Sequence, residues 1–257
     1  MHKRTFSAIR ILMILAAAAC GSAWTATGLE STVLHSRVLG EDRPLNIILP
    51  VDYSPDESYP VVYVLDGGEE HLTFVAGQMQ TVLPGLIAVG VENVDRSRDM
   101  FPEPIPERRN LGGGGEKFLA FITTELIPHI EKAYPADGFR VLVGQSNSGF
   151  FVLYAMLNAP DAFDAYLASS PMIGWDWEMI AGGSRDLLAG RESFDKVLFM
   201  NRGTTDLDNT IDFLPGYVEL LTEIAPADFR WTSVVAQGEE HVPDSSYREG
   251  IAFIFNR

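Results

Sequence analysis

A serine at the tip of a glycine-rich turn is the first residue of this chain that could do covalent chemistry. Ser146 stands in the stretch GQSNSG at 144–149, between an apolar run at 141–143 and a helical pattern at 150–157. A strand, a tight turn and a helix in this order form a nucleophile elbow, in which the serine hydroxyl projects from the turn. The helix would point its N-terminus at the reacting centre, which favours a developing negative charge. The pattern predicts a nucleophilic serine; a plain Gly/Ser turn that caps a helix is the alternative.

The turn departs from the usual Gly-x-Ser-x-Gly pattern at one position. Ser148 occupies the fifth place, and the glycine is delayed to Gly149. Small residues are needed there because the helix and the strand approach closely. Serine is small, but the mismatch weakens the motif, so the rest of the chain must supply the other groups of a site.

A nucleophilic serine needs a base, and an acid that orients the base. In α/β-hydrolases these follow the serine in the order acid, then histidine. His241 is the one histidine after the last expected strand, in the loop GEEHVP at 238–243, and we expect it to be the base. A solvated loop histidine is the alternative. The other histidines beyond the first twenty residues precede the serine: His35, His71 and His129.

The acid should follow the strand that ends near Met200. Asp206, Asp208 and Asp212 all qualify, and Asp206 is the first choice because it lies nearest the strand. Each could instead be an ordinary loop or helix-cap aspartate. A Ser–His pair that works without a strong acid is also open.

Backbone amides complete such a site by binding the oxyanion. We expect one donor to be the N–H of Asn147, directly after the serine, and the other to be the N–H of Gly68 in the turn Asp66-Gly67-Gly68. Glycine there would let the backbone approach a substrate oxygen, so Gly67 is also a candidate substrate contact. A plain Gly-Gly turn is the alternative. His71, shortly after this turn, could line the pocket.

Hydrophobic patterning predicts one α/β domain at 31–257. Strands alternate with helices, which favours a largely parallel sheet, and an antiparallel hairpin comes first. Residues 92–115, rich in charge, proline and glycine, are expected to be a long loop. The expected strands are 32–39, 44–49, 60–65, 83–91, 141–143, 165–168, 196–200 and 229–236, and the expected helices are 117–133 with a kink at Pro128, 150–157, 213–224 and 247–255.

Composition excludes several classes of partner. The formal net charge of −16 argues against nucleic acid and anionic membranes, and it disfavours a polyanionic substrate. A high acidic charge that serves solubility is the simplest interpretation. No metal-binding motif is present, and the glycine run at 112–115 lacks the Lys-Ser/Thr of a phosphate loop. We therefore expect no metal and no cofactor.

The N-terminus is typical of an export signal. Basic residues precede a short apolar core in residues 1–19, too short to span a bilayer stably. Cys20, the single cysteine, stands where a lipoprotein signal would be cleaved, although Ala17 replaces the leucine usual in such signals. We expect export to the periplasm or medium, with a lipid anchor at Cys20 as the alternative, and a linker at 20–30. Oligomeric state is open.

Several stretches of this chain resemble one family of proteins. They include YPVVYVLDGGEEHLTF at 59–74, IAVGVENVDRSRDMFP at 87–102, GGGEKFLAFITTELIPHIEKAYP at 113–135, AYLASSPMIGWDWEM at 165–179 and GEEHVPDSSYREGIAFIF at 238–255. Together they resemble the esterase family of α/β-hydrolases that includes siderophore esterases, feruloyl esterases and S-formylglutathione hydrolase, over roughly residues 30–257.

The resemblance implies an α/β-hydrolase fold with helices on both faces of the sheet, and a serine carboxylic-ester hydrolase acting on a small-molecule ester. It implies Ser146 as nucleophile, His241 as base and an acid after the strand at 197–200. It also implies a structural or pocket-edge loop that contains Arg96, Arg98 and Asp99, and we expect these three to be structural.

Residues beside the turn could contact the substrate. Phe150 and Trp175, with Trp177, could stack on an aromatic or sugar ring, and core packing is the alternative. Gly174 stands where many relatives carry a tryptophan, so the pocket is expected to be larger here. The acidic surface suits an anionic ferric siderophore poorly.

Three other functions use the same residues. An acyltransferase would share the catalytic groups, and its products would distinguish it from a hydrolase. A serine peptidase would be recognised by cleavage of amide substrates. A non-catalytic binding protein commonly lacks one of the catalytic residues, whereas Ser146 and His241 are both present.

Overall fold

A single eight-stranded sheet organises the part of the chain that the computed structural model describes, residues 28–106 and 111–256. The strand order is β1-β2-β4-β3-β7-β8-β9-β10. β2 is antiparallel to β1 and β4, and all other neighbours are parallel. The expected parallel sheet with an antiparallel hairpin is confirmed. The strands are β1 (Leu29–Ser36), β2 (Glu41–Ile48), β3 (Tyr59–Leu65), β4 (Ile87–Val91), β7 (Ala136–Gln145), β8 (Ala165–Ser169), β9 (Val197–Gly203) and β10 (Arg230–Ala236).

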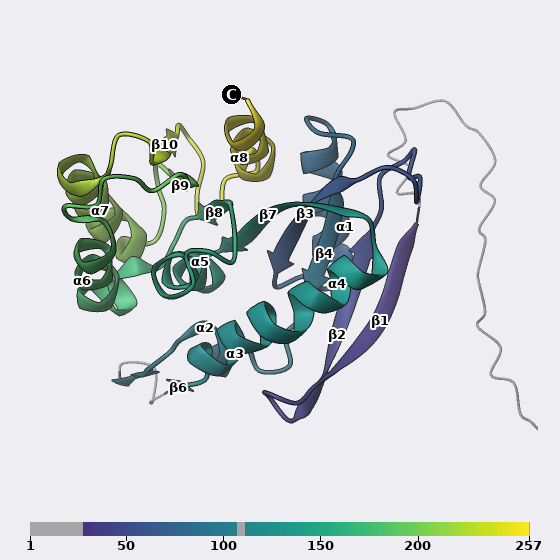
Figure 1. The fold of residues 1–257 in the computed structure, drawn as a ribbon. Helices are drawn as coiled ribbons and strands as arrows, with labels where there is room; N and C mark the ends of the chain where they lie inside the picture. Colours follow the sequence, from purple (N-terminus) through teal and green to yellow (C-terminus); the bar gives the residue numbers. More distant parts are fainter. Residues whose placement is uncertain (1–27, 107–110, 257) are drawn as a thin grey trace, which may run out of the picture.

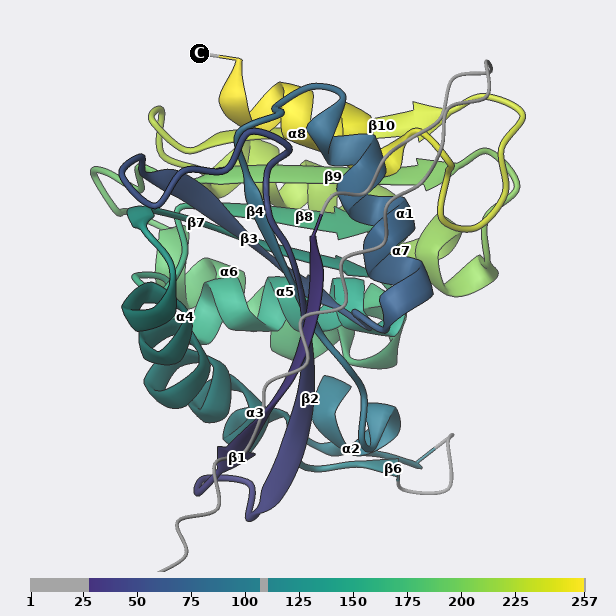
Figure 2. The ribbon, with the colours of Figure 1, turned by 90° about the vertical axis from the view of Figure 1, so that its right-hand side faces the viewer.

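Helices cover both faces of the sheet, which buries the central strands (Figure 1, Figure 2). Every residue of β3, β4 and β8 is buried, as expected for parallel strands between two helical layers. On one face lie α1 (Glu69–Gln80) and α8 (Ser246–Phe255), and on the other lie α3 (Gly115–Phe121), α4 (Ile127–Ala133), α5 (Asn147–Asn158), α6 (Trp177–Leu188) and α7 (Asp208–Ile224). The expected export signal, Cys20 and most of the linker lie outside the described residues.

The expected kinked helix at 117–133 begins slightly earlier and bends in a particular way. It runs from α3 through a π-helical segment at Ile122–Leu126 into α4, and Pro128 stands at the start of α4. Proline has no N–H to donate to the preceding turn, and a wider π turn is one way a helix tolerates this. The sequence therefore predicted the position of the irregularity, and the structure shows its form.

Two helices of 12 residues each, α1 and α6, were not expected from the sequence. α1 buries Leu72, Val75, Ala76 and Met79, a spacing that is helical. In α6 the pair Gly182-Gly183 weakens the helical signal, and Asp176 caps its N-terminus by accepting from the Met179 N–H at 3.0 Å.

The expected long loop at 92–115 is wrong in part, because it contains regular structure. It holds the short helix α2 (Arg96–Met100) and the two-residue strands β5 (Pro104–Ile105) and β6 (Leu111–Gly112), which pair antiparallel. Asp95 caps α2 through the Arg98 N–H at 3.0 Å. The charged residues of α2 made the segment resemble a solvated loop in the sequence, but they form tertiary contacts.

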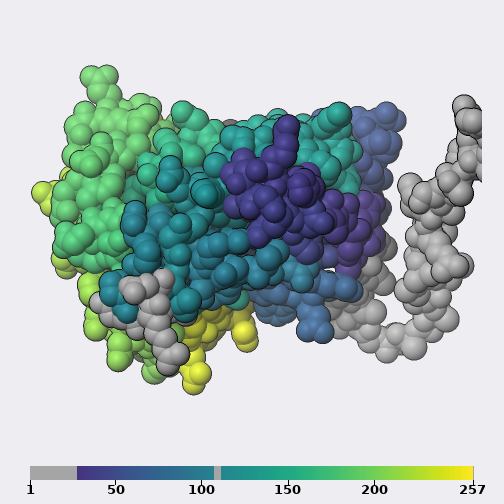
Figure 3. Space-filling view, turned by 90° about the horizontal axis from the view of Figure 1, so that it is seen from below, coloured from purple at the N-terminus to yellow at the C-terminus, as the bar shows by residue number. Residues whose placement is uncertain are grey.

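A buried ionic cluster joins α2 to the opening hairpin. The fully buried guanidinium of Arg43 donates to Asp99, also fully buried, at 2.7 Å and to Glu41 at 2.8 Å. Arg98 adds hydrogen bonds to Glu41 at 2.6 and 2.9 Å and to Asp99 at 2.7 Å. Arg43 also lies 4.9 Å from the ring centroid of Phe118. Figure 3 shows the purple hairpin against the blue segment that carries α2. Arg98 and Asp99 are thus structural, as expected.

The Glu41→Gln variant tests this cluster. Hydrogen bonds from Arg98, and then from Arg43, lower the pKa of Glu41 to about 2 from an ordinary 4.5. The carboxylate therefore stabilises the fold above pH 4.5, and that contribution is lost as pH falls toward 2. We expect the variant to lose about 1 kcal/mol of unfolding free energy at pH 7, because the partly exposed pair is screened, and less at pH 3. Urea unfolding at both pH values measures this. Glu223→Gln, on the exposed face of α7, is the control; an equal loss for Glu41→Gln at both pH values would contradict the assignment.

Candidate active site

Four residues with left-handed backbone angles mark one edge of the sheet. Asp66 (φ 58°) follows β3, Ser146 (φ 56°) follows β7, Ser170 (φ 44°) follows β8, and Val242 (φ 60°) lies in the loop after β10. Among the described residues these are all the non-glycine residues with positive φ. Such angles cost of order 1–3 kcal/mol each and cluster at functional sites, where surrounding contacts hold them. The carboxyl edge of the parallel strands is therefore the candidate site.

Ser146 has the geometry of a nucleophile elbow. It leaves β7 at φ 56° and ψ −120°, and α5 begins at the next residue, Asn147. Its N–H donates to the Ser169 carbonyl at 2.9 Å, and its side chain is partly exposed. Its hydroxyl has no hydrogen-bond partner within the described part of the chain. The Ser146 hydroxyl is therefore available to a ligand.

Glycines at 144 and 149 are what this turn requires. A Cβ on Gly144 would lie 2.4 Å from the carbonyl oxygen of Ser148, and a Cβ on Gly149 would lie 3.1 Å from Pro171 Cα and from the Ser169 oxygen. Position 148 carries no such restriction, because its side chain points between the turn and the end of β3. The expected glycine is therefore displaced by one residue without loss of the elbow.

The Ser148 hydroxyl joins the elbow to the turn after β3. Its oxygen lies 2.8 Å from Asp66 Oδ2 and 2.8 Å from the Gln145 carbonyl, and it accepts from the Gln145 N–H at 2.9 Å. Arg96 donates twice to Asp66, both at 2.8 Å, and Asn93 donates at 2.6 Å. Burial alone would raise the pKa of Asp66, but the hydrogen bonds from Arg96, followed by the Arg96 charge and the bonds from Asn93 and Ser148, hold the pKa below its usual range. Arg96 thus supports the turn from the site side, whereas Arg98 and Asp99 serve the hairpin.

Asp206 and His241, the acid and the base expected from the sequence, lie in direct contact. Asp206 Oδ1 lies 2.5 Å from His241 Nδ1, the aspartate side chain is fully buried, and the histidine side chain is 25% exposed. Burial would raise the pKa of Asp206, but hydrogen bonds from His241, Ser170 and the Leu207 N–H outweigh it and lower the pKa. An ionised carboxylate cannot donate, so Nδ1 is the donor in this hydrogen bond, and Nε2 carries a lone pair whenever the ring is neutral. Nε2 is buried without a hydrogen-bond partner. This is the arrangement of a general base.

The alternative acids lie elsewhere. Asp208 is the first residue of α7 and Asp212 lies one turn further, and both side chains are exposed. Of the remaining histidines, His35 is exposed and bound to Asp42, and His129 is exposed on α4. Asp206 is therefore the aspartate that meets His241.

Close approach of two loops makes this pair possible. Gly203 ends β9, and a Cβ there would lie 2.0 Å from the Glu240 carbonyl oxygen, one residue before His241. The Thr205 N–H donates to the Glu239 carbonyl at 3.2 Å, and the Thr204 N–H donates to Ala236 at 3.1 Å. Gly203 has no role among the expectations from the sequence, although a glycine at the end of a strand before a candidate acid is the signal that could have revealed it.

The expected oxyanion donors differ in availability. Asn147 opens α5, so its N–H has no acceptor inside the helix, and it is directed to the helix N-terminal end beside Ser146. The Gly68 N–H donates to the Asp66 carbonyl at 2.9 Å. Gly67 is not a substrate contact, since its N–H donates to Val91, its carbonyl accepts from Asn46, and its Cα packs against Gly90.

Two of the expected substrate contacts lie beside Ser146. Trp175 is partly exposed and its indole N–H donates to Asn147 Oδ1 at 3.2 Å. His71 is partly exposed and packs edge-on against Tyr247, whose hydroxyl donates to Gln145 at 2.6 Å. Burial lowers the pKa of His71, which favours its neutral form.

Two other expectations about the pocket are wrong. Phe150 is fully buried and packs against Phe101 with ring centroids 5.4 Å apart, because α5 is enclosed by the sheet and its neighbours. It is a core residue. Gly174 does not enlarge the pocket, because Phe213 of α7 fills the space: a Cβ on Gly174 would lie 2.5 Å from that ring.

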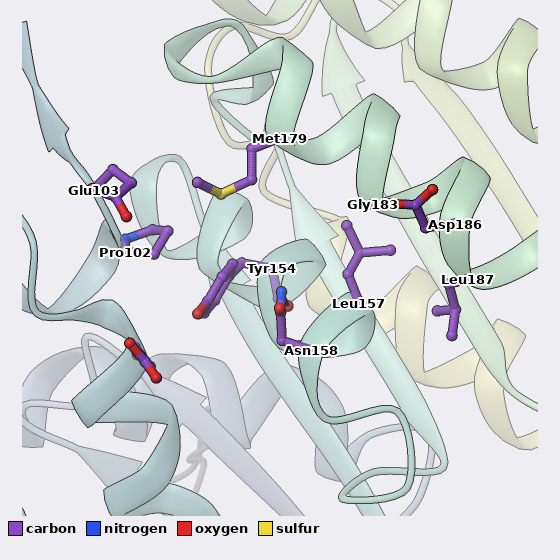
Figure 4. Close-up of a pocket in the computed structure, with 10 residues that line it drawn as sticks. Pro102, Glu103, Tyr154, Leu157, Asn158, Met179, Gly183, Asp186 and Leu187 are labelled. Atoms are coloured by element: carbon purple, nitrogen blue, oxygen red, sulfur yellow. Dashed lines mark hydrogen bonds between the residues drawn. The ribbon is translucent and has the colours of Figure 1, made fainter.

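A separate groove of about 500 Å³ lies between α5 and α6 (Figure 4). It contains none of the residues of the candidate site, and Glu103, Glu116 and Asp186 make it acidic. The full lining is Pro102, Glu103, Glu116, Tyr154, Leu157, Asn158, Met179, Gly183, Asp186 and Leu187.

The described residues contain no group of three or more metal-ligating side chains that could hold an ion. Nor does any helix among them have the length and apolar character needed to cross a membrane.

Comparison with known proteins places the chain in context. Residues 36–197 match the model of the family described as "Putative esterase". Ferri-bacillibactin esterase BesA of Bacillus subtilis is 34% identical over 182 residues, which cover 60% of this chain and 62% of BesA. The chain thus spans less than two thirds of that relative.

Two solved structures share the fold over most of the chain. An IroE-like serine hydrolase from Shewanella oneidensis gives a TM-score of 0.78 at 28% identity, covering 88% of this chain and 79% of that one. The BES protein from Bacillus cereus gives 0.76 at 26% identity, covering 93% and 99%. The α/β-hydrolase fold is therefore shown.

The Gly203→Ala variant tests the loop contact. The added methyl group must separate the acid loop from the histidine loop, so we expect ester hydrolysis to fall at least tenfold while the fold persists. Kinetics and circular dichroism measure both. Gly182→Ala, with open space at its Cβ, is the matched control, and wild-type activity in Gly203→Ala would contradict the prediction.

Ser148→Ala tests the link between the elbow and Asp66. Removing the hydroxyl leaves a buried carboxylate oxygen with one donor fewer, so we expect unfolding free energy to fall by about 1.5 kcal/mol. Ser148→Gly restores the usual motif but not the hydrogen bond, and we expect it to lose at least as much. Thermal and urea unfolding measure both variants; a Ser148→Gly variant as stable as wild type would show that the hydroxyl is dispensable.

Proposed function

We propose that this chain, which belongs to the esterase family whose model it matches, is a serine carboxylic-ester hydrolase. The observation that carries the proposal is the Asp206–His241 pair, 2.5 Å apart, with an unpartnered Nε2 beside the edge of the sheet that presents Ser146. An acid that fixes the histidine tautomer and a base with a free lone pair are what a weakly nucleophilic serine requires.

In the proposed reaction Ser146 Oγ attacks the ester carbonyl carbon while His241 Nε2 takes the hydroxyl proton. The resulting imidazolium is stabilised by the Asp206 carboxylate, which stays ionised. His241 then gives the proton to the departing alkoxide, and the acyl group remains on Ser146. Water, deprotonated by His241, attacks the acyl-enzyme and releases the carboxylic acid and the free serine.

The oxyanion formed in each half-reaction would accept hydrogen bonds from backbone amides. The Asn147 N–H stands at the N-terminus of α5, where the helix dipole favours negative charge. We propose the Gly68 N–H as the second donor; it must share or release its hydrogen bond to the Asp66 carbonyl when substrate binds. In the free protein Arg96 and Ser148 hold this turn through Asp66.

We propose a small-molecule ester as the substrate. The relative named ferri-bacillibactin esterase makes siderophore esters the first class to test. His71 and Trp175 offer partly exposed rings. Trp175 binds Asn147 directly, and His71 packs on Tyr247, which binds Gln145. The net charge of −16 favours a neutral or weakly charged ester over a highly anionic complex.

We also propose export, on the pattern of residues 1–19 and Cys20. Fractionation of a bacterial host, with mass spectrometry of the mature N-terminus, tests it: a free residue at 20 or beyond indicates secretion, a lipid on Cys20 indicates an anchor, and an intact Met1 in the cytoplasm contradicts the proposal.

Substitution of the three catalytic candidates tests the activity. With a series of p-nitrophenyl esters, we expect Ser146→Ala and His241→Ala to lower kcat/KM by at least 10³-fold, since an acyl-enzyme cannot form without either group. Asp206→Asn should lower it by about 10³–10⁴-fold, because the amide favours the wrong histidine tautomer.

Asp208→Asn is the matched control for the acid and should retain activity, since its side chain is exposed at the start of α7. Hydrolysis by Ser146→Ala at the wild-type rate would rule out the proposed nucleophile, whereas loss in Asp208→Asn together with activity in Asp206→Asn would move the acid.

A further inference from the structure

Ser170 occupies a constrained position that the reaction scheme above does not use. It is the first residue after β8, it is fully buried, and its φ of 44° is in the left-handed region. Its N–H donates to the Asn201 carbonyl of β9 at 2.8 Å. Serine rarely adopts this angle, so neighbouring contacts must hold it there.

The Ser170 hydroxyl bridges the two loops that meet at the catalytic pair. It donates to Asp206 Oδ2 at 2.6 Å, a direction fixed because a carboxylate can only accept. The same oxygen accepts from the Val242 N–H at 2.9 Å. One hydroxyl on the β8 loop therefore contacts the acid after β9 and the residue directly after the base.

Each of these contacts restrains one partner of the pair. Asp206 Oδ1 is occupied by His241 and the Leu207 N–H, whereas Oδ2 receives Ser170 and a longer bond of 3.2 Å from the Gly203 N–H. Ser170 thus supplies the shorter of the two hydrogen bonds that hold Oδ2 and restrict the rotation of the carboxylate. On the other side, Val242 has a φ of 60°, an angle that a β-branched residue adopts only under constraint.

We propose that Ser170 is a positioning residue for the Asp206–His241 pair. Its hydroxyl orients the acid and, by holding the Val242 amide, keeps the backbone next to His241 in its left-handed conformation. This inference rests on the proposed function, because it concerns the same pair. Without the hydroxyl the carboxylate can rotate and the backbone at Val242 can relax, so the imidazole loses its fixed direction.

Ser169 supplies a matched control. It is the preceding residue, it is also fully buried, and its hydroxyl donates to Ser246 at 2.9 Å, with no contact to Asp206 or Val242. Ser169→Ala therefore removes a buried hydroxyl from the same segment without touching the pair. Ser170→Gly is the second variant, since glycine tolerates the positive φ and lacks the hydroxyl.

We expect Ser170→Ala and Ser170→Gly to lower kcat by about 10–100-fold with KM changed less than threefold, by analogy with the loss seen when a group that orients a metal-bound histidine is removed. Ser169→Ala should stay within threefold of wild type. Circular dichroism and thermal unfolding establish that the variants fold. If Ser170→Gly retains full activity and only Ser170→Ala loses it, backbone strain is the cause and the proposal is overturned.

A measurement without substrate separates this proposal from the proposed function. We expect the proton between His241 Nδ1 and Asp206 to give a downfield NMR resonance, which its absence from the His241→Ala spectrum identifies. We expect it to move upfield or broaden in both Ser170 variants and to be unchanged in Ser169→Ala. An unchanged resonance in the Ser170 variants, or failure of both to fold while Ser169→Ala folds, would overturn the positioning role.

Wild-type protein without esterase activity but with the expected NMR changes would refute the proposed function alone. Active wild-type protein in which the Ser170 variants keep kcat and the resonance would refute the positioning role alone.

Discussion

The parallel register of β7, β8 and β9 is the constraint on which the candidate site depends. Gln145 pairs with Ser169, and Ser169 with Asn201, so three strands reach their carboxyl ends side by side. The chain leaves the sheet directly after these positions, at Ser146 and Ser170, and a few residues later reaches Asp206. Loops from parallel strands diverge only after they leave the sheet, which is why functional groups collect at this edge. The histidine loop joins them because Val234 of β10 pairs with Asn201.

Strained backbone at this edge is matched by specific contacts. Ser146 is held through its N–H by Ser169, Ser170 by the Asn201 carbonyl, Val242 by the Ser170 hydroxyl and Asp66 by the Arg96 guanidinium. Each left-handed residue costs of order 1–3 kcal/mol, so the buried hydrogen bonds that surround it must compensate. The backbone at these four residues is therefore fixed by contacts within the protein itself. The strained backbone angles thus persist because these hydrogen bonds hold them.

Much of the fold and part of the site could be read from the sequence. Buried parallel strands leave apolar runs such as 60–65 and 141–143, and the order serine, acid, histidine depends on topology that local patterns reveal. The link between Ser170 and Asp206 could not be read, because it joins loops 36 residues apart and local patterning carries no information on such contacts. Phe150 was misassigned because it lies one helical turn after the partly exposed Ser146, whereas the helix buries that turn completely. The charges of α2 resembled a solvated loop because their buried partner, Arg43, lies on another element.

The displaced glycine of the elbow bears on how relatives of this protein are recognised. A methyl group at Gly144 would overlap the Ser148 carbonyl, and one at Gly149 would be tight against Pro171 and Ser169, while position 148 holds a hydroxyl that reaches Asp66. A pattern search that demands glycine two residues after the nucleophile would pass over this chain. A search based on steric demand would instead require a glycine two residues before the serine and accept a small polar residue two residues after it. It would also require an aspartate directly after the neighbouring strand, within hydrogen-bonding distance of that polar residue. Such a rule would group sequences by the contact they make rather than by a letter they share.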